Sequence, residues 1–189
     1  MGITACNVSG MTFHAALGIG KHTLSRTMLS ASHDLIAAWE GVDFLFVDEV
    51  SMISCHFLCM ISKRLSLAKG DPGSFGGINM IFAGDFAQLS PVAETRLYTK
   101  INTHNVAGTV QGQRILFGKI LWLSVSIIVI LMRNHHQSGP ENAAFVSLLG
   151  HLWKGRCINA DHRLLSSRII NSDNYDADIG NWSGVSESC

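Results

Sequence analysis

Residues 43–52 read DFLFVDEVSM, and this stretch decides the fold of the chain. Four apolar residues run without interruption from Phe44 to Val47 and lead directly into two adjacent carboxylates, Asp48 and Glu49. Strands of parallel sheets are covered on both faces, so they show continuous apolar runs instead of alternation. Ligands of open α/β sheets bind beyond the carboxyl ends of such strands. The stretch predicts a buried strand followed either by a ligand-binding acidic pair or by a solvated acidic turn.

The two carboxylates would serve a nucleotide site in different ways. Asp48 would hold Mg²⁺, usually through water, because a hard cation prefers oxygen ligands. Glu49 would polarise a water molecule for attack on the terminal phosphate.

A second stretch, residues 78–92, reads INMIFAGDFAQLSPV and again joins an apolar strand to a polar turn. The amide of Gln88 can donate to a phosphate oxygen and accept from a water molecule. The turn follows the acidic strand by some three dozen residues, which suits a crossover between parallel strands. A third apolar run at 122–131, rich in Ile and Val, predicts another strand of the same sheet. We expect an α/β fold with Asp48 and Gln88 at one edge of that sheet.

Helical patterns separate and follow the strands. Ser51 or Ser54 can cap a helix that the GDPG sequence at 70–73 ends. Apolar residues recur every four positions along one face of this helix, at Ile53, Phe57, Ile61 and Leu65. Other helices are expected at 27–40, 113–119, 141–152 and 159–168, the last capped by Asn159. Residues 171–189 lack periodicity, and we expect them to be disordered.

Composition excludes several classes of protein. The chain has 14 Lys and Arg against 14 Asp and Glu, for a net charge of zero, so it has no electrostatic footprint for strong autonomous nucleic-acid binding. Its 47% apolar content is ample for a core and argues against global disorder. The five cysteines form no CxxC pair and indicate reduced thiols of an intracellular protein: Cys6, Cys55, Cys59, Cys157 and Cys189.

Three motifs of the sequence have simpler interpretations than a functional site or a membrane span. Gly20-Lys21 is not a phosphate-binding loop, because the pattern requires glycine where Ala15 stands and Ser or Thr where His22 stands. Cys55, His56 and Cys59 could bind a metal, but without a second ligand pair we favour ordinary thiols. The apolar region 115–132 contains Lys119 and is too short for a membrane-spanning helix, so a buried strand is favoured.

Taken together, these stretches resemble the Pif-type (petite integration frequency) DNA helicases, most closely the helicase region of Helitron transposons. The likeness covers about residues 1–168 and is carried by GITA at 2–5, TFH at 12–14, DEVSM at 48–52, ISKRL at 61–65, FGG at 75–77, FAGDFAQL at 82–89 and SGPEN at 138–142.

The resemblance implies a superfamily 1 motor that hydrolyses ATP with Mg²⁺ and moves 5′ to 3′ along single-stranded DNA. It implies Asp48 as the Mg²⁺ ligand, Glu49 as the catalytic base and Gln88 as the sensor of the γ-phosphate. Asp85 joins these residues in binding ATP. The implied DNA contacts are Thr4, Thr12 and His14.

By the same resemblance, residues 1–132 form a partial first RecA-like domain and residues 133–170 begin a second. The implied partners are single-stranded DNA and ATP, with no membrane. The implied processes are repair, recombination, telomere maintenance or transposition. We expect an intracellular protein of the nucleus, with mitochondria as the alternative.

The chain departs from the family pattern in ways that affect turnover. The family's phosphate-binding loop falls upstream of Met1, Ser90 replaces the first of two prolines, and His136 stands where an arginine reaches the γ-phosphate. Arginine is permanently charged and forked, whereas histidine offers fewer donors. Arg133 lies three residues away, and its substitution for that arginine is not assumed. We expect a fragment or decayed copy that turns ATP over poorly. A DNA-binding remnant and a truncated gene model of an intact helicase are the alternatives.

Overall fold

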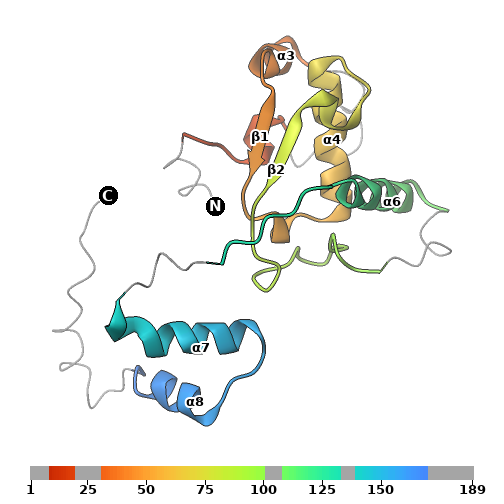
Figure 1. The fold of residues 1–189 in the computed structure, drawn as a ribbon. Helices are drawn as coiled ribbons and strands as arrows, with labels where there is room; N and C mark the ends of the chain where they lie inside the picture. Colours follow the sequence, from red (N-terminus) through yellow and green to blue (C-terminus); the bar gives the residue numbers. More distant parts are fainter. Residues whose placement is uncertain (1–8, 20–30, 101–107, 133–138, 170–189) are drawn as a thin grey trace. The chain divides into compact units, whose positions relative to one another are not determined.

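The computed structural model describes residues 9–19, 31–100, 108–132 and 139–169 (Figure 1). The chain divides into two compact units, Met1–Val129 and Ile130–Cys189. Several predictions concern positions outside the described residues, namely those for Thr4, Arg133, His136, the start of the helix at 27–40 and the tail at 171–189. The assignment of residues 1–132 and 133–170 to two helicase domains stays a prediction.

The first unit is built on two parallel strands, β1 (Phe44–Val47) and β2 (Asn79–Phe82). Phe44 pairs with Asn79 and Val47 with Phe82, so both strands end at the same edge of the sheet. The parallel pairing of these two strands confirms the predicted α/β fold. The other elements that the described residues of this unit form are α2 (Phe13–Ala16), α3 (His33–Trp39), α4 (Cys55–Lys69), α6 (Val110–Leu123) and short 3₁₀ helices at Val50–Met52 and Ser74–Gly77.

The crossover helix α4 begins and ends where local chemistry predicts. The hydroxyl oxygen of Ser54 accepts a hydrogen bond from the backbone N–H of Phe57 over 3.0 Å, so Ser54 and not Ser51 is the cap. Gly70 ends the helix in the left-handed conformation, with φ of 66°. Ile61 and Leu65, two members of the predicted apolar repeat, are completely buried. The helix therefore presents the predicted face to the core.

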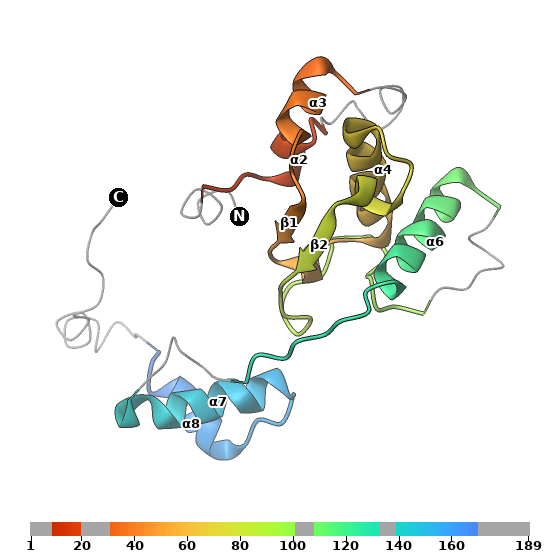
Figure 2. The ribbon, with the colours of Figure 1, turned by 45° about the horizontal axis from the view of Figure 1, so that its top comes forward.

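Helix α6 lies very close to α4 (Figure 2). A Cβ atom added at Gly118 would lie 1.8 Å from the carbonyl oxygen of Cys55, so only glycine permits this approach. One turn further along α6, the ring of Trp122 meets those of Phe82 and Phe86 edge-on, at centroid distances of 5.7 and 5.6 Å. Helix α6 therefore covers the end of β2.

The strand expected at 122–131 is wrong. Helix α6 continues through Leu123, beyond the short helix expected at 113–119, and residues 125–132 form no strand in the part of the chain that is described. The six apolar side chains at 127–132 are between 75% and 89% exposed. A short apolar run is compatible with helix or strand, and here the packing of Trp122 on β2 keeps the start of the run helical. None of the helices described here is long and apolar enough to cross a membrane.

The described residues cover the sheet on one face only, whereas the apolar run of β1 predicts burial on both. Val47 is 1% exposed, and Phe82 packs against the core on the same face. Phe44 and Phe46 are 67% and 63% exposed. Successive residues of a strand point to opposite faces, and the buried residues of the first unit gather on the Val47 side.

The second unit contains a helical hairpin. A 3₁₀ turn at Pro140–Asn142 leads into α7 (Ala143–Trp153), and α8 (Asn159–Ser166) follows. Both helices match the predictions for 141–152 and 159–168. The expected cap at Asn159 is wrong, because the N-cap is Ile158, whose N–H donates to the Asp161 carboxylate over 2.8 Å. Asp161 also contacts Nδ1 of His151 at 2.9 Å and so joins the two helices.

Candidate nucleotide-binding and DNA-binding sites

The turns that follow β1 and β2 are in direct contact. The backbone N–H of Val50 donates to the carbonyl of Ala83 over 2.9 Å, and the N–H of Ala83 donates to the carbonyl of Val47 over 2.8 Å. Gly84 lies so close that an added Cβ would be 2.8 Å from the backbone nitrogen of Val50. The structure therefore brings the acidic turn at Asp48 next to the turn from Gly84 to Gln88.

Glu49 has an unusual backbone conformation. Its φ and ψ of 55° and 43° lie in the left-handed region, which costs a non-glycine residue about 1–3 kcal/mol. Its N–H donates to Oδ1 of Asp48 over 2.9 Å. The side chain of Glu49 is half-buried and that of Asp48 is exposed, so the two carboxylates differ in environment. Strained residues of this kind concentrate at functional sites.

Asp85 organises the turn after β2. Its Oδ1 accepts a hydrogen bond from the N–H of Ala87 over 2.9 Å, and its backbone carbonyl accepts from the N–H of Gln88 over 3.1 Å. The amide nitrogen of Gln88 lies 3.5 Å from Oδ2 of Asp85. The Gln88 side chain is exposed, so it can reach a ligand at this edge, while Asp85 holds the turn in shape.

The donor set at this edge fits Mg²⁺ bound together with a nucleotide. No cluster of three or more His, Cys, Asp or Glu side chains that could hold a metal exists among the residues described. Mg²⁺ commonly uses one or two carboxylates and completes its shell with water and phosphate oxygens. The exposed carboxylate of Asp48 suits that mode of binding.

Two of the three predicted DNA contacts lie at α2. Thr12 is its N-cap, and the Thr12 hydroxyl oxygen accepts a hydrogen bond from the N–H of Ala15 over 3.4 Å. The hydroxyl hydrogen of Thr12 remains available as a donor. The His14 imidazole is exposed and stacks on the ring of Phe57, with centroids 5.4 Å apart and planes 21° apart. The sequence indicated Phe57 only as a core residue and not as a support for His14.

The Cys-His-Cys motif of α4 belongs to the core. Cys55 and Cys59 are completely buried, and this burial raises the pKa of both thiols. A raised pKa disfavours the thiolate, which is the metal-binding form. Burial also lowers the pKa of His56, against the opposing effect of nearby Glu94. The motif therefore supplies neutral groups to the α4–α6 interface.

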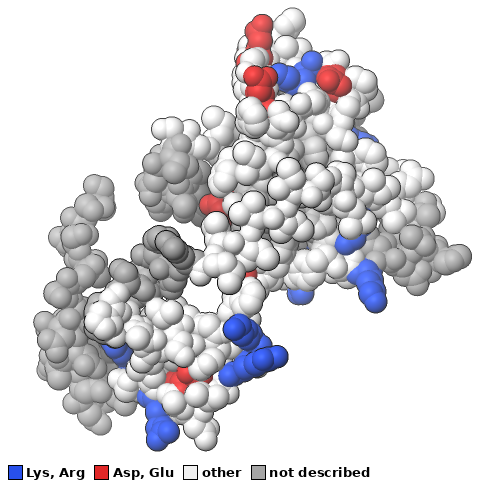
Figure 3. Space-filling model, in the orientation of Figure 1, with Lys and Arg blue, Asp and Glu red and all other residues white. Residues whose placement is uncertain are grey.

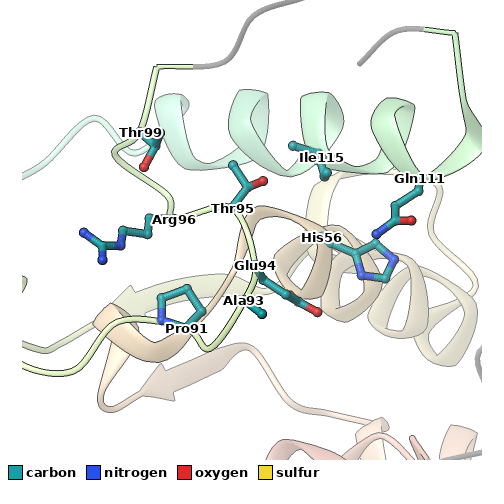
Figure 4. Close-up of a pocket in the computed structure, with 9 residues that line it drawn as sticks. All are labelled: His56, Pro91, Ala93, Glu94, Thr95, Arg96, Thr99, Gln111 and Ile115. Carbon is teal, nitrogen blue, oxygen red and sulfur yellow. The ribbon is translucent and has the colours of Figure 1, made fainter. Parts of the chain in front are cut away.

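A cavity of about 470 Å³ lies between the start of α4, α6 and the loop at 91–99 (Figure 4). Glu94 extends toward His56 and accepts a hydrogen bond from the hydroxyl of Ser54. None of the predicted nucleotide or DNA residues lines this cavity. Sequence reasoning missed it because residues 93–112 carry no motif, and only the fold brings them to α4.

The class of the fold is that of the RecA-like α/β domains found in its structural neighbours. The structure is similar to Pif1 helicase from Candida albicans, with a TM-score of 0.67 and 22% identity over 90% of this chain and 36% of that chain. It is also similar to Pif1 helicase from Bacteroides in complex with ADP-AlF3 and ssDNA, with a TM-score of 0.64 and 26% identity over 92% of this chain and 40% of that chain.

Residues 1–163 match the family model of the PIF1-like helicases, and the chain belongs to this family. ATP-dependent DNA helicase PIF1 of Xenopus laevis is 29% identical over 159 residues, which are 82% of this chain and 22% of that protein. The family resemblance predicted from the motifs is thus confirmed. The chain spans less than a quarter of the length of this relative.

Proposed function

We propose that this chain is part of an ATP-dependent DNA helicase and that the edge formed by the turns after β1 and β2 acts in ATP hydrolysis. The observation that carries the proposal is the contact between these turns through Val50 and Ala83, which brings the carboxylates near the Gln88 turn. The Xenopus relative is named as an ATP-dependent DNA helicase, and the Bacteroides neighbour is a complex with ADP-AlF3 and ssDNA.

The proposed residue roles follow from exposure and chemistry. The exposed carboxylate of Asp48 would hold Mg²⁺ through water, and that cation would supply positive charge against the phosphates. The half-buried Glu49 polarises the attacking water as general base. The exposed amide of Gln88 donates to the γ-phosphate and accepts from that water, and Asp85 fixes the backbone that presents it.

The DNA partner of the proposed helicase is a single strand, contacted at Thr12 and His14 of α2 and at Thr4. Movement from 5′ to 3′, action in repair, recombination, telomere maintenance or transposition, and a nuclear or mitochondrial location are part of the same proposal. They are supported by the family to which the chain belongs.

We further propose that the chain by itself turns ATP over slowly. By the resemblance of the motifs, His136 stands at the position of the family arginine that contacts the γ-phosphate. An arginine of this kind is worth about 10³–10⁵ in rate in related phosphoryl-transfer enzymes. A neutral imidazole cannot replace its permanent charge or its forked donors.

Two substitutions with a matched control test the nucleotide site. Binding of a fluorescent ATP analogue is titrated with and without Mg²⁺, and phosphate release is followed in parallel. We expect Asp48→Asn to abolish the Mg²⁺-dependent part of binding. We expect Glu49→Gln to preserve binding and to lower any phosphate release by about 10²–10⁴. Glu40→Gln changes an exposed carboxylate of the same unit and should have no effect.

Two results would contradict the nucleotide site. One is Mg²⁺-dependent binding that is unchanged in Asp48→Asn. The other is DNA-stimulated phosphate release that survives Glu49→Gln.

A second candidate function is DNA binding without turnover. It is favoured by the α2 segment, in which Thr12 and His14 are exposed and His14 is supported by Phe57. A chain that binds oligo(dT) but not the ATP analogue would establish this second function in place of the first.

A further inference from the structure

Helix α2 is too short to hold its own position. It has four residues, and isolated helices shorter than about 12 residues are marginal in water. Its place on the molecule must therefore come from contacts with other elements. The exposed residues Thr12 and His14 depend on those contacts for their orientation.

One set of contacts comes from the first turn of α4. The ring of Phe57 stacks on His14 at a centroid distance of 5.4 Å and meets the edge of Phe13 at 6.0 Å, with those two planes at 90°. Phe57 is half-buried and packs against the core, and these contacts fix the position of its ring. His14 is exposed above it. The three rings form an aromatic cluster in which Phe57 is the base.

A second set of contacts ties the end of α2 down. The buried side chain of Arg64, two turns further along α4, donates from Nε and Nη2 to the carbonyl of Leu17 over 3.1 and 3.0 Å. The indole N–H of Trp39 donates to the carbonyl of Ala16 over 3.1 Å. The backbone at the end of α2 is thus held independently of the aromatic cluster. Loss of the Phe57 ring would release the His14 side chain without detaching α2.

We propose that Phe57 is the positioning residue for the DNA contact at His14. The inference rests on the proposed function of α2, and it assigns Phe57 a role that acts through the His14 imidazole and not through DNA itself. The stack restricts the imidazole to one orientation before the strand binds. A preorganised group loses less conformational entropy on binding than a free one.

The test measures affinity for fluorescently labelled oligo(dT) by anisotropy, together with the ring-proton resonances of His14, which sense the ring current of Phe57. Phe57→Leu keeps an apolar side chain at this position and removes the ring. We expect it to shift the His14 resonances and to weaken DNA binding by about threefold to tenfold, in line with the strength of aromatic pairs. Phe57→Tyr keeps the ring, so the His14 resonances and the DNA affinity should stay close to those of the unmodified chain.

A double-mutant cycle and a control separate positioning from general damage. His14→Ala should weaken binding, and adding Phe57→Leu to it should cause little further loss, because both changes remove one interaction. Phe117→Leu changes a half-exposed ring of α6 and should leave affinity unchanged.

The outcomes are distinguishable. If His14→Ala weakens binding but Phe57→Leu does not, even though the His14 resonances shift, the positioning role is overturned and the DNA contact stands. Additive losses in the double variant overturn it as well. If His14→Ala has no effect on binding, the DNA contact itself is wrong, and the positioning role falls with it.

Discussion

The N–H of Val50 donates to the carbonyl of Ala83 over 2.9 Å, and this bond joins the acidic turn to the glutamine turn. The two residues lie on opposite sides of the crossover helix in the sequence. Parallel pairing of β1 and β2 makes them neighbours, because the carboxyl ends of both strands reach the same edge. The candidate hydrolysis site is therefore a product of strand pairing and not of either turn alone.

This contact predicts that Gly84 cannot be replaced. A Cβ there would lie 2.8 Å from the nitrogen of Val50, and the φ of 153° is unfavourable for other residues. We expect Gly84→Ala to lower the free energy of unfolding by about 1–3 kcal/mol, in the range of strained backbone positions. Chemical denaturation measures the loss. Gly108→Ala, where an added Cβ meets nothing within 4 Å, is the control, and equal losses in the two variants would refute the argument.

Two helical glycines should respond in opposite directions. Gly118→Ala would place a Cβ 1.8 Å from the carbonyl oxygen of Cys55, so α6 must move away from α4 and stability should fall by about 1–3 kcal/mol or more. Gly150 of α7 has nothing within 4 Å of an added Cβ. Gly150→Ala should raise stability by up to about 1 kcal/mol through helix propensity. Thermal or urea melts in which Gly118→Ala is as stable as the unmodified chain, or more stable, would contradict the close approach of α6 to α4.

Stability should decline in alkaline solution because of the buried thiols. Burial raises the pKa of Cys55 and Cys59 above their ordinary value of 9.0, so the folded state keeps them neutral while the unfolded chain ionises. Their contribution to stability is complete below pH 9.0 and is lost as the pH rises toward the higher folded-state pKa values. Urea denaturation at a series of pH values measures the loss.

The double variant Cys55→Ala/Cys59→Ala is the control for this decline and should lose less stability over the same pH interval. Over the same pH interval, iodoacetamide should modify the exposed Cys157 before either buried thiol. Rapid labelling of Cys55 would show that the α4–α6 interface opens easily.

The uncovered face of the sheet should promote self-association. Figure 3 shows one side of the first unit with few charged groups on its surface. Phe44 and Phe46 are 67% and 63% exposed on a short parallel sheet, and exposed apolar strands tend to associate with other chains. We expect Phe46→Thr to reduce concentration-dependent light scattering while leaving the melting temperature nearly unchanged, because Thr suits a strand.

Phe75 is a buried phenylalanine that serves as the comparison for the exposed Phe46. It is only 6% exposed, so Phe75→Ala should lower stability by about 3–5 kcal/mol. A Phe46→Thr variant that scatters light as strongly as the unmodified chain would show that self-association does not occur through this face of the sheet.

The sequence by itself determined the features that depend on near neighbours in the chain. The apolar runs of β1 and β2, the helix cap and the helix stop are local effects. The sequence predicted both strands, a cap at Ser51 or Ser54 and a stop at 70–73, and the structure assigns the cap to Ser54 and the left-handed stop to Gly70. Side-chain alternation, hydrogen bonding of a cap and the conformational freedom of glycine act within a few residues. The family motifs are likewise short stretches, which is why the family could be identified before the fold was known.

The tertiary structure alone decided how the chain's distant parts meet. Residues 122–131 were predicted as a strand, but Trp122 lies in the last turn of α6 and packs against Phe82, a contact that no local pattern encodes. The stack of His14 on Phe57 joins residues 43 positions apart, and periodicity indicates only that Phe57 faces the core. Burial and ring contacts are set by three-dimensional packing. A sequence pattern therefore predicts which side chains will be buried, but it does not predict which residues will pack against them.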